Sequence, residues 1–238
     1  MNQRPYVTLN IAMTIDGKTD TISRKGAMIS STLDMERVDR LRAESDAVMV
    51  GGRTLQGDDP RLTVKSEVLR AERLSRGLEE NPIKVGVVTQ ATLPINSRFI
   101  TTGPARKVIF TTTQTDASQV ARLRQHGVQV SLTEGGRVDL VNAMKELKQG
   151  GVGRLLVEGG GTLNEELLKR GLVDEIRVYI APLIFGGENA PTFVSGVGLE
   201  RQNAIPLRLV DVHRSNGGLI LRYLVGKTES QTNKNQGV

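Results

Sequence analysis

The alternation of strand-like and helix-like segments through residue 170 is the feature that most constrains the fold of this chain. Apolar residues alternate along residues 6–13, which is the period of a half-buried strand. Ser31 and Thr32 then have the character of a helix N-cap, and a helical pattern runs from there to about Glu44. Because strand-like and helical patterns keep alternating after this, the sequence predicts an α/β fold with a largely parallel sheet.

The later segments continue this pattern and change it near the C-terminus. Strands are expected at 47–50, 83–88, 107–111, 128–132 and 154–158, and helices at 117–126, 140–147 and 164–170. Three further strands are expected at 175–181, 207–213 and 219–225. Asn216-Gly217 lies between the last two, and Asn-Gly between alternating runs is a strong hairpin signal. The sheet is therefore expected to end in antiparallel strands.

The domain organisation follows from the absence of any repeat or break in composition. A single domain is expected over residues 1–226. Residues 57–82 are polar and predict a loop or short helix rather than a linker. Residues 227–238 are polar and lack periodicity, which predicts a flexible tail.

Composition excludes several classes of function. The chain has no cysteine and two histidines, so it cannot form a disulfide or a zinc site with Cys ligands, and we expect no metal. Aromatic residues make up 3%, which disfavours stacking platforms for nucleic acid. The net charge of +6 comes from scattered basic residues and suits an enzyme with phosphorylated ligands. No segment has the pattern of a signal peptide or membrane span, so we expect a cytoplasmic protein with no membrane association.

The most informative segment is 156–164, where an apolar strand runs into Gly159, Gly160 and Gly161 and then into a helix. Glycines let backbone amides approach a ligand closely, and a helix N-terminus favours an anion. This favours a site for the pyrophosphate of a dinucleotide, although a tight turn without a ligand would show the same pattern. The segment is not the Rossmann fingerprint, because Asn164 stands where that motif needs a glycine.

A second glycine turn, Gly51-Gly52, follows the expected strand at 47–50 and leads into Asp58-Asp59-Pro60. The paired aspartates could bind a metal or cap a turn, and the turn is favoured because no further ligands lie nearby. Arg61 and Lys65 would suit a phosphate or could be solvated. The residue types alone therefore indicate an α/β enzyme that binds a phosphorylated nucleotide.

Several segments together resemble one family, the pyrimidine reductases of riboflavin biosynthesis, which have a dihydrofolate-reductase-like fold. The matching segments are 12–18, 40–43, 49–51, 58–64, 157–164, 171–175, 179–182 and 185–187. They occur in the family's order from about residue 5 to residue 226, and this ordered set is far more specific than any one segment. The resemblance implies a mostly parallel central sheet flanked by helices, with antiparallel C-terminal strands.

The resemblance also implies an activity, the NADPH-dependent reduction of a ribosylamino-pyrimidine 5′-phosphate to its ribitylamino form. The chain resembles the stand-alone enzymes of archaea and fungi, whose substrate is 2,5-diamino-6-ribosylamino-4(3H)-pyrimidinone 5′-phosphate. The deaminated substrate, 5-amino-6-(5-phosphoribosylamino)uracil, is an alternative. A more remote alternative is a basic nucleotide- or RNA-binding protein without catalysis.

The family's site residues are carried over by position. The residues that resemble contacts of NADPH are Thr54, Asp58, Thr89, Gly159, Gly160, Gly161, Thr162, Leu163 and Asn164. Those on the substrate side are Arg42, Arg61, Leu62, Lys65 and Glu158. The stretch 24–28 departs from the substrate-side residues of fused bacterial members, and 66–81 is longer than usual.

The roles expected of these residues follow their chemistry. Arg42, Arg61 or Lys65 is expected to neutralise the 5′-phosphate, and Glu158 to accept hydrogen bonds from amino groups of the pyrimidine. Asp16, after the first strand, is a candidate for proton handling or for orienting the substrate, or it holds an Asp-Gly turn.

A homodimer is expected from the C-terminal strands. Ile176, Val178 and Ile180 form an apolar stripe, and 182–185 is a second apolar run without charge. An edge strand this apolar needs cover, which a two-fold partner would supply to both chains. The family resemblance also implies a dimer.

Overall fold

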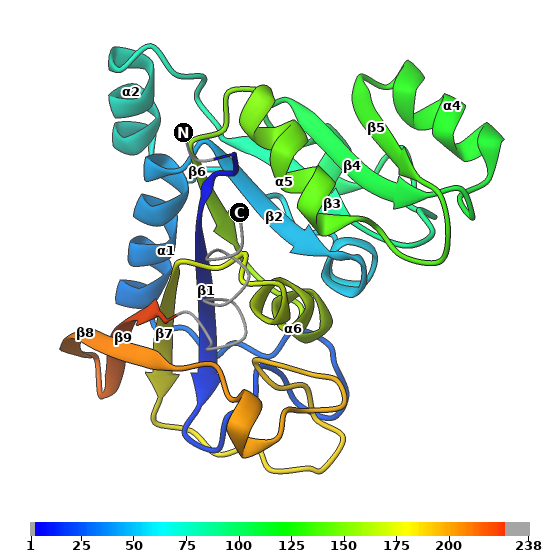
Figure 1. The fold of residues 1–238 in the computed structure, drawn as a ribbon. Coiled ribbons are helices and arrows are strands. Elements are labelled where there is room, and N and C mark those ends of the chain that lie inside the picture. Colours follow the sequence, from blue (N-terminus) through cyan, green and yellow to red (C-terminus); the bar gives the residue numbers. More distant parts are fainter. Residues whose placement is uncertain (1–2, 227–238) are drawn as a thin grey trace, which may run out of the picture. The chain divides into compact units, whose positions relative to one another are not determined.

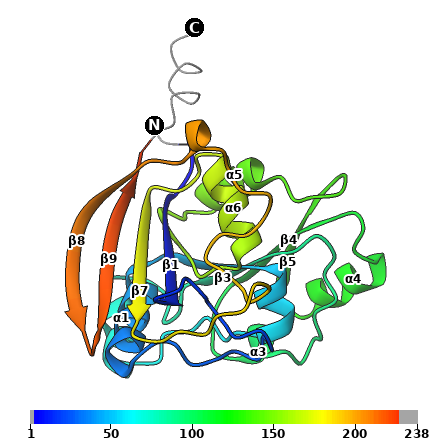
Figure 2. The ribbon, with the colours of Figure 1, turned by 90° about the horizontal axis from the view of Figure 1, so that it is seen from below.

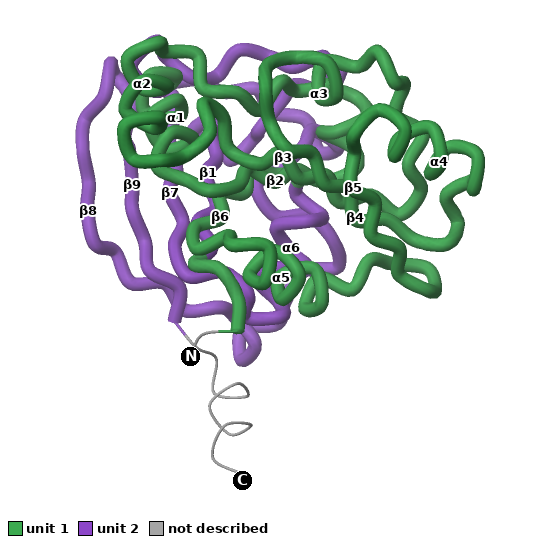
Figure 3. The backbone as a smooth tube through the Cα atoms, turned by 90° about the horizontal axis from the view of Figure 1, so that it is seen from above, with its two compact units in different colours: residues 1–6, 35–160 green, residues 7–34, 161–238 purple. Residues whose placement is uncertain are grey.

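The structure is a computed structural model that describes residues 3–226, and the expected tail at 227–238 lies outside the described residues. The chain forms two compact units (Figure 3). Unit 1 comprises Met1–Tyr6 and Met35–Gly160, and unit 2 comprises Val7–Asp34 and Gly161–Val238. The prediction of a single domain over 1–226 stays a prediction.

Unit 1 contains a parallel sheet. Its strands are β2 (Ala47–Gly51), β3 (Ile83–Val87), β4 (Lys107–Thr112), β5 (Val128–Thr133) and β6 (Arg154–Val157). They lie in the order β5-β4-β3-β2-β6, and every neighbouring pair in this unit is parallel (Figure 1). All five residues of β2 are buried. Strands of a parallel sheet are covered on both faces, so this continuous apolar run fits its central place.

The helices of unit 1 largely match the sequence pattern. They are α1 (Thr32–Glu44, whose first residues belong to unit 2), α2 (Glu67–Ser75), α3 (Arg98–Thr101), α4 (Ala117–Gln125), α5 (Leu140–Gln149) and a π-helical turn (Thr54–Asp58). Side chains of Ser66, Asp116 and Asp139 cap α2, α4 and α5 by accepting backbone N–H bonds. The sequence pattern did not predict α3 or the π-helical turn.

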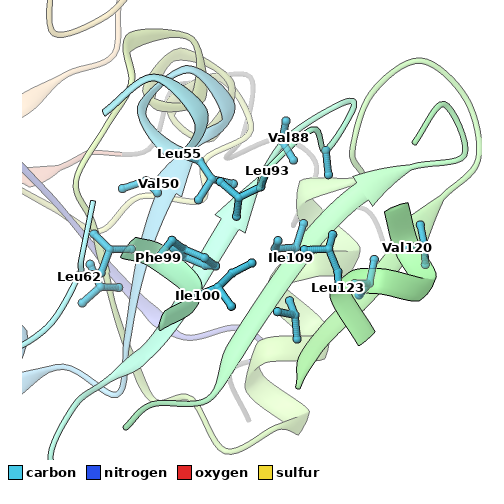
Figure 4. Close-up of a cluster of buried hydrophobic side chains, with 14 of the residues drawn as sticks. Val50, Leu55, Leu62, Val88, Leu93, Phe99, Ile100, Ile109, Val120 and Leu123 are labelled. Atoms are coloured by element: carbon cyan, nitrogen blue, oxygen red, sulfur yellow. The ribbon is translucent and has the colours of Figure 1, made fainter. Parts of the chain in front are cut away.

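The core of unit 1 is a cluster of buried aliphatic side chains with one aromatic ring (Figure 4). Leu55, from the π-helical turn, packs against Gly86 of β3, where an added Cβ would lie 2.6 Å from the leucine side chain. A glycine is therefore needed there for the turn after β2 to pack onto the sheet. This packing fixes the carboxyl end of β2.

Lys84 in β3 is an unusual member of this interior, because its side chain is wholly buried. Its Nζ donates to the carbonyl oxygens of Phe99 (3.1 Å) and Thr102 (2.5 Å) at the end of α3. The pKa of Lys84 is lowered to about 8, mainly by burial and also by the neighbouring charge of Lys107, while the charge of Asp59 opposes the change. The folded protein thus holds this proton less tightly than the unfolded chain does.

We expect the free energy of unfolding to rise with pH between about 8 and 10.5, because the unfolded chain keeps the Lys84 proton over this range. The fall from 10.5 to about 8 corresponds to about 3 kcal/mol, at about 1.4 kcal/mol per pKa unit. Lys84→Met should remove this rise in urea unfolding measured across that range. Lys107→Met, at the paired position of β4, should keep most of it. Equal slopes in the Lys84→Met variant and the unsubstituted protein would contradict the assignment.

Unit 2 combines parallel and antiparallel pairing. Its elements are β1 (Tyr6–Thr14), α6 (Gly161–Lys169), β7 (Glu175–Ala181), a 3-10 turn (Arg201–Asn203), β8 (Leu207–Ser215) and β9 (Gly218–Val225). β1 pairs in parallel with β7, whereas β9 is antiparallel to both β7 and β8. The helix α6 begins at Gly161 rather than at Asn164. The antiparallel C-terminal strands confirm the prediction.

The turn between β8 and β9 confirms the hairpin predicted from Asn216-Gly217. Asn216 has φ 48° and Gly217 has φ 81°. A two-residue hairpin turn of this kind needs positive φ at both central residues, which Asn and Gly tolerate best.

The expectation that β7 is an edge strand is wrong. β7 lies between β1 and β9, and β8 is the outer strand of this unit (Figure 2). Ile176 is 2% exposed and Val178 is 5% exposed, so their apolar stripe is already covered. The sequence shows that a stripe is apolar but not which strand pairs outside it, and here the β8–β9 hairpin adds two strands beyond β7.

Candidate functional site

The carboxyl ends of β2, β3 and β6 form a rim on unit 1. The strand order places β6 directly beside β2, on the opposite side from β3. In open α/β sheets, ligands bind at the carboxyl ends where the strand order reverses in this way. Two backbone bonds tie the rim together, from Glu158 N to Met49 O (2.9 Å) and from Gly51 N to Gly159 O (2.8 Å).

Glycines at this rim let neighbouring segments, or a ligand, come close to the main chain. At Gly52 an added Cβ would lie 2.9 Å from Val88 Cγ2, so only glycine allows the ends of β2 and β3 to approach so closely. At Gly160 an added Cβ would lie 3.4 Å from Thr54 Oγ1, filling the space beside that hydroxyl. Gly159 has φ 93°, in the left-handed region that favours glycine. These features suit a phosphate-bearing dinucleotide, whose phosphates are held by main-chain amides.

Thr89 lies at the same rim, one residue after the contact of Val88 with Gly52. Its carbonyl oxygen accepts bonds from the hydroxyls of Thr111 (3.1 Å) and Thr112 (2.7 Å), while its own side chain is exposed. The ends of β3 and β4 are thus tied together by threonines. Of the residues expected to contact the cofactor, the structure brings Thr54, Thr89, Gly159 and Gly160 to this rim of unit 1.

The paired aspartates after the π-helical turn take different roles. Asp59 caps α3, because its carboxylate accepts the N–H groups of Arg98 (2.8 Å) and Phe99 (3.0 Å). Asp58 has an exposed side chain, and its carbonyl oxygen accepts a bond from Arg98. Within residues 3–226, no group of three or more acidic or histidine side chains is arranged to hold a metal ion.

The loop that follows, residues 59–66, has a strained backbone. Asp59 has φ 43° and Leu62 has φ 52°, although neither is glycine. Leu62 was expected on the substrate side, but its side chain is 1% exposed and belongs to the core of unit 1. Strained conformations persist only where surrounding contacts fix them, and they concentrate at functional sites.

Side-chain acceptors from outside the loop supply those contacts. Asn81 Oδ1 accepts Val64 N (2.9 Å), and the carboxylate of Asp39 accepts Lys65 N (2.7 Å) and the next amide. Arg61 and Lys65 keep exposed side chains on this fixed loop. The sequence reading missed Asp39 and Asn81. The one available signal was that Asp39 lies three residues before Arg42, on the same helix face.

Arg42 and Glu158, both expected on the substrate side, form a bidentate ion pair. Arg42 Nε donates to Glu158 Oε1 and Arg42 Nη2 donates to Glu158 Oε2, each at 2.7 Å. The remaining Nη1 donates to the carbonyl oxygen of Thr63 (3.0 Å). Burial disfavours the charge of Arg42, but the Glu158 carboxylate outweighs it and raises the pKa of Arg42 above its ordinary value. All three nitrogens of the guanidinium are therefore engaged within the protein.

The rest of the glycine segment lies in unit 2. Gly161 has no room for a side chain, since an added Cβ would clash with Ser195 and with the carbonyl of Thr192. Asn164 is 1% exposed and donates from Nδ2 to the carbonyl oxygen of Phe193 (2.9 Å). Leu163 is buried and Thr162 is exposed. Of the last four residues predicted to contact the cofactor, only Thr162 offers an exposed side chain.

Asp16 holds two segments of unit 2 together. Its carboxylate accepts the hydroxyl of Thr14 and the N–H groups of Gly186 (2.7 Å) and Phe185 (3.3 Å). The bond from Thr14 is the main cause of a lowered pKa of Asp16, and the amides of Gly186 and Phe185 add to it. The Asp16 carboxylate is exposed to solvent and therefore stays ionised at neutral pH.

Comparison with known proteins identifies relatives along most of the chain. Residues 5–221 match the model of the RibD C-terminal domain. The chain is 43% identical over 193 residues to 2,5-diamino-6-ribosylamino-4(3H)-pyrimidinone 5′-phosphate reductase of Archaeoglobus fulgidus, covering 81% of this chain and 87% of the relative. It is 41% identical to the protein of the same name from Methanothermobacter thermautotrophicus, covering 93% of this chain and 99% of the relative.

Solved structures agree on the fold. Acinetobacter baumannii RibD superposes with a TM-score of 0.77 at 25% identity, covering 94% of this chain and 59% of the longer one. A pyrimidine reductase-like protein of Corynebacterium diphtheriae superposes with a TM-score of 0.79 at 20% identity, covering 94% and 92%. These neighbours confirm the predicted α/β, dihydrofolate-reductase-like fold. Among residues 3–226, none of the helices has the length and apolar character needed to cross a bilayer.

Proposed function

The chain belongs to the RibD C-terminal domain family, and we propose that it is a reductase of riboflavin biosynthesis. Its substrate is 2,5-diamino-6-ribosylamino-4(3H)-pyrimidinone 5′-phosphate, which it converts to the ribitylamino form. The observation that carries this proposal is the 41% and 43% identity to two archaeal reductases of that name, over most of each chain. The deaminated pyrimidine and a non-catalytic role find no such support.

The cofactor is a nicotinamide dinucleotide, and we propose NADPH. The rim of unit 1 fits it, because Gly159 and Gly160 bring backbone without side chains to the carboxyl end of β6, where Gly160 lies beside Thr54 Oγ1, and Thr89 follows β3 at the same rim. The ribosylamine opens to an imine by breaking its C1′–O4′ bond, with the amine proton passing to O4′. The dinucleotide, when bound, would supply the hydride that C1′ of this imine accepts, while the imine nitrogen takes a proton from solvent. The protein binds and orients both molecules, and Asp58 on the π-helical turn adds an exposed acceptor.

The substrate phosphate is bound by Arg61 and Lys65. Both side chains are exposed on the fixed loop 59–66, whereas the guanidinium of Arg42 is occupied by Glu158 and Thr63. Charge-assisted bonds to phosphate are strong, so two free cations on a rigid loop form a suitable clamp.

The remaining substrate contacts follow from charge. Glu158 accepts hydrogen bonds from amino groups of the pyrimidine through the lone pairs that Arg42 leaves available. Asp16 is ionised at neutral pH, and a general acid needs a pKa near the working pH. Asp16 therefore orients the substrate, or holds the segment at Phe185 and Gly186, rather than donating a proton.

The proposed assembly is a cytoplasmic homodimer. The strand register puts Leu207, Leu209 and Val212 of β8 on the same face as Leu221, Tyr223 and Val225 of β9. The three β8 side chains are 46–49% exposed, so the apolar face remains open at the edge of the unit. Ile184 adds to the exposed apolar surface of this unit. A two-fold copy would cover such a face in both chains at once.

The function is tested by following NADPH oxidation with the diamino and the deaminated pyrimidine ribotides side by side. We expect turnover of the diamino compound, with NADH a poorer hydride donor. The heat-inactivated protein gives the background rate. Turnover of the deaminated compound alone would show that this compound, and not the diamino ribotide, is the substrate. Turnover of neither compound, together with salt-sensitive binding to RNA, would contradict the proposal that the protein is an enzyme.

A further inference from the structure

The ion pair between Arg42 and Glu158 joins three separate segments of unit 1. Arg42 comes from α1, Glu158 follows β6, and Thr63 lies in the loop 59–66. The side chains of the pair are 15% and 13% exposed. A planar guanidinium that makes two parallel bonds to one carboxylate fixes the orientation of that carboxylate as well as its charge.

The pair is electrically neutral as a unit, so it offers no net positive charge to the substrate phosphate. If Arg42 turned to bind phosphate, its fork would open and the Glu158 carboxylate would be left largely buried without its cation. Breaking a buried pair in this way is strongly unfavourable. The contact with Thr63 would also be lost, and with it one restraint on the loop that carries Arg61 and Lys65.

We propose that Arg42 is a positioning residue for Glu158 and for the loop 59–66, and that it does not bind the substrate phosphate. Arg42 orients the carboxylate toward the pyrimidine and ties it to the phosphate-binding loop. This inference rests on the proposed function, since it assigns the way in which two residues of that site share the substrate.

Two consequences distinguish this role from a direct phosphate contact. First, Arg42 and Glu158 act as one unit, so removing both costs no more than removing either one. Second, removal of Arg42 weakens recognition of the pyrimidine and changes the preference for a phosphorylated substrate far less than loss of Arg61 does, because Asn81 and Asp39 still hold the loop at Val64 and Lys65. Arg61→Ala is the matched control, because it removes a cation that lies on the same loop and is exposed.

The test is a double-mutant cycle with Arg42→Gln, Glu158→Gln and the combined variant, and Arg42→Lys as the conservative change. KM and kcat are measured with the diamino ribotide and with its dephosphorylated riboside. We expect each single variant to raise KM for the ribotide by about 10- to 100-fold, as for loss of a hydrogen bond to a charged group. The combined variant should be no worse, and Arg42→Lys should recover part of the loss.

The ratio of kcat/KM for ribotide over riboside gives the decisive readout. It should stay near the unsubstituted value in Arg42→Gln and fall at least tenfold in Arg61→Ala. A fall in Arg42→Gln as large as that in Arg61→Ala, or additive losses in the cycle, would overturn the positioning role. NADPH affinity, measured by fluorescence, identifies any variant that fails to fold. If Arg42→Gln fails to fold, Arg42→Lys replaces it in the comparison. If the unsubstituted protein reduces neither compound, it is the proposed function that fails.

Discussion

Replacing Gly160 by Asp is expected to weaken dinucleotide binding by on the order of 100-fold. The added side chain would enter the space beside Thr54 Oγ1, 3.4 Å from the Cβ position, and place a negative charge where a pyrophosphate is expected. Like charges brought together in a binding site cost several kcal/mol. Titration of NADPH fluorescence measures the effect directly.

Two further variants separate the causes of this loss. Gly160→Ala adds only the Cβ, at an ordinary contact distance from Thr54, so we expect a smaller effect. Gly136→Asp adds the same charge on an exposed glycine whose Cβ would meet only the end of Gln114, and it should bind NADPH normally. Normal binding by Gly160→Asp would show that the pyrophosphate lies elsewhere.

Replacing Val212 by Glu is expected to dissociate the proposed dimer. Val212 lies on the apolar face of β8 and β9, paired with Leu221. A charge buried without a partner costs about 3–5 kcal/mol, which corresponds to a rise of at least 100-fold in the dissociation constant. Light scattering at micromolar concentration should then give a mass near that of one 25.9 kDa chain.

His213→Glu is the matched control for this substitution, because it puts the same residue one position along the strand. His213 pairs with Ile220 and belongs to the other face of the hairpin. We expect this variant to keep the mass of a dimer. A mass near 25.9 kDa for the unsubstituted protein would rule out a stable dimer, and loss of the dimer in both variants would exclude this face as the specific interface.

Most of the fold could be predicted from the sequence because its signals are local. The alternation along β1, the apolar runs of β2 and β3 and the Asn216-Gly217 turn each determine nearby backbone. The place of β7 could not be predicted, since pairing with β9 depends on contacts between distant segments. The short helix α3 was also missed. Its cap is the side chain of Asp59, which lies far before it in the chain.

The sequence indicated which residue types lie at the candidate site, but not most of the contacts that these residues make. The glycine pattern indicated the rim at Gly159 and Gly160, and the structure places Thr54 and Thr89 there. The sequence gives no means of seeing that Arg42 is engaged by Glu158, because residues from α1 and β6 meet only in the fold. A glycine can also be required at a position for more than one reason. Gly161 is required by packing against Thr192 and Ser195, which a phosphate-loop pattern does not distinguish.

The loop 59–66 has a kinetic consequence. Asn81, Asp39 and Arg42 fix its strained backbone through four hydrogen bonds. Its ordering entropy is therefore lost when the chain folds and need not be lost again when a ligand arrives. The proposed capture of a phosphorylated ligand by Arg61 and Lys65 would then require no slow rearrangement of this loop. We therefore expect the association rate of such a ligand to be set by diffusion and charge attraction, and to fall as ionic strength rises.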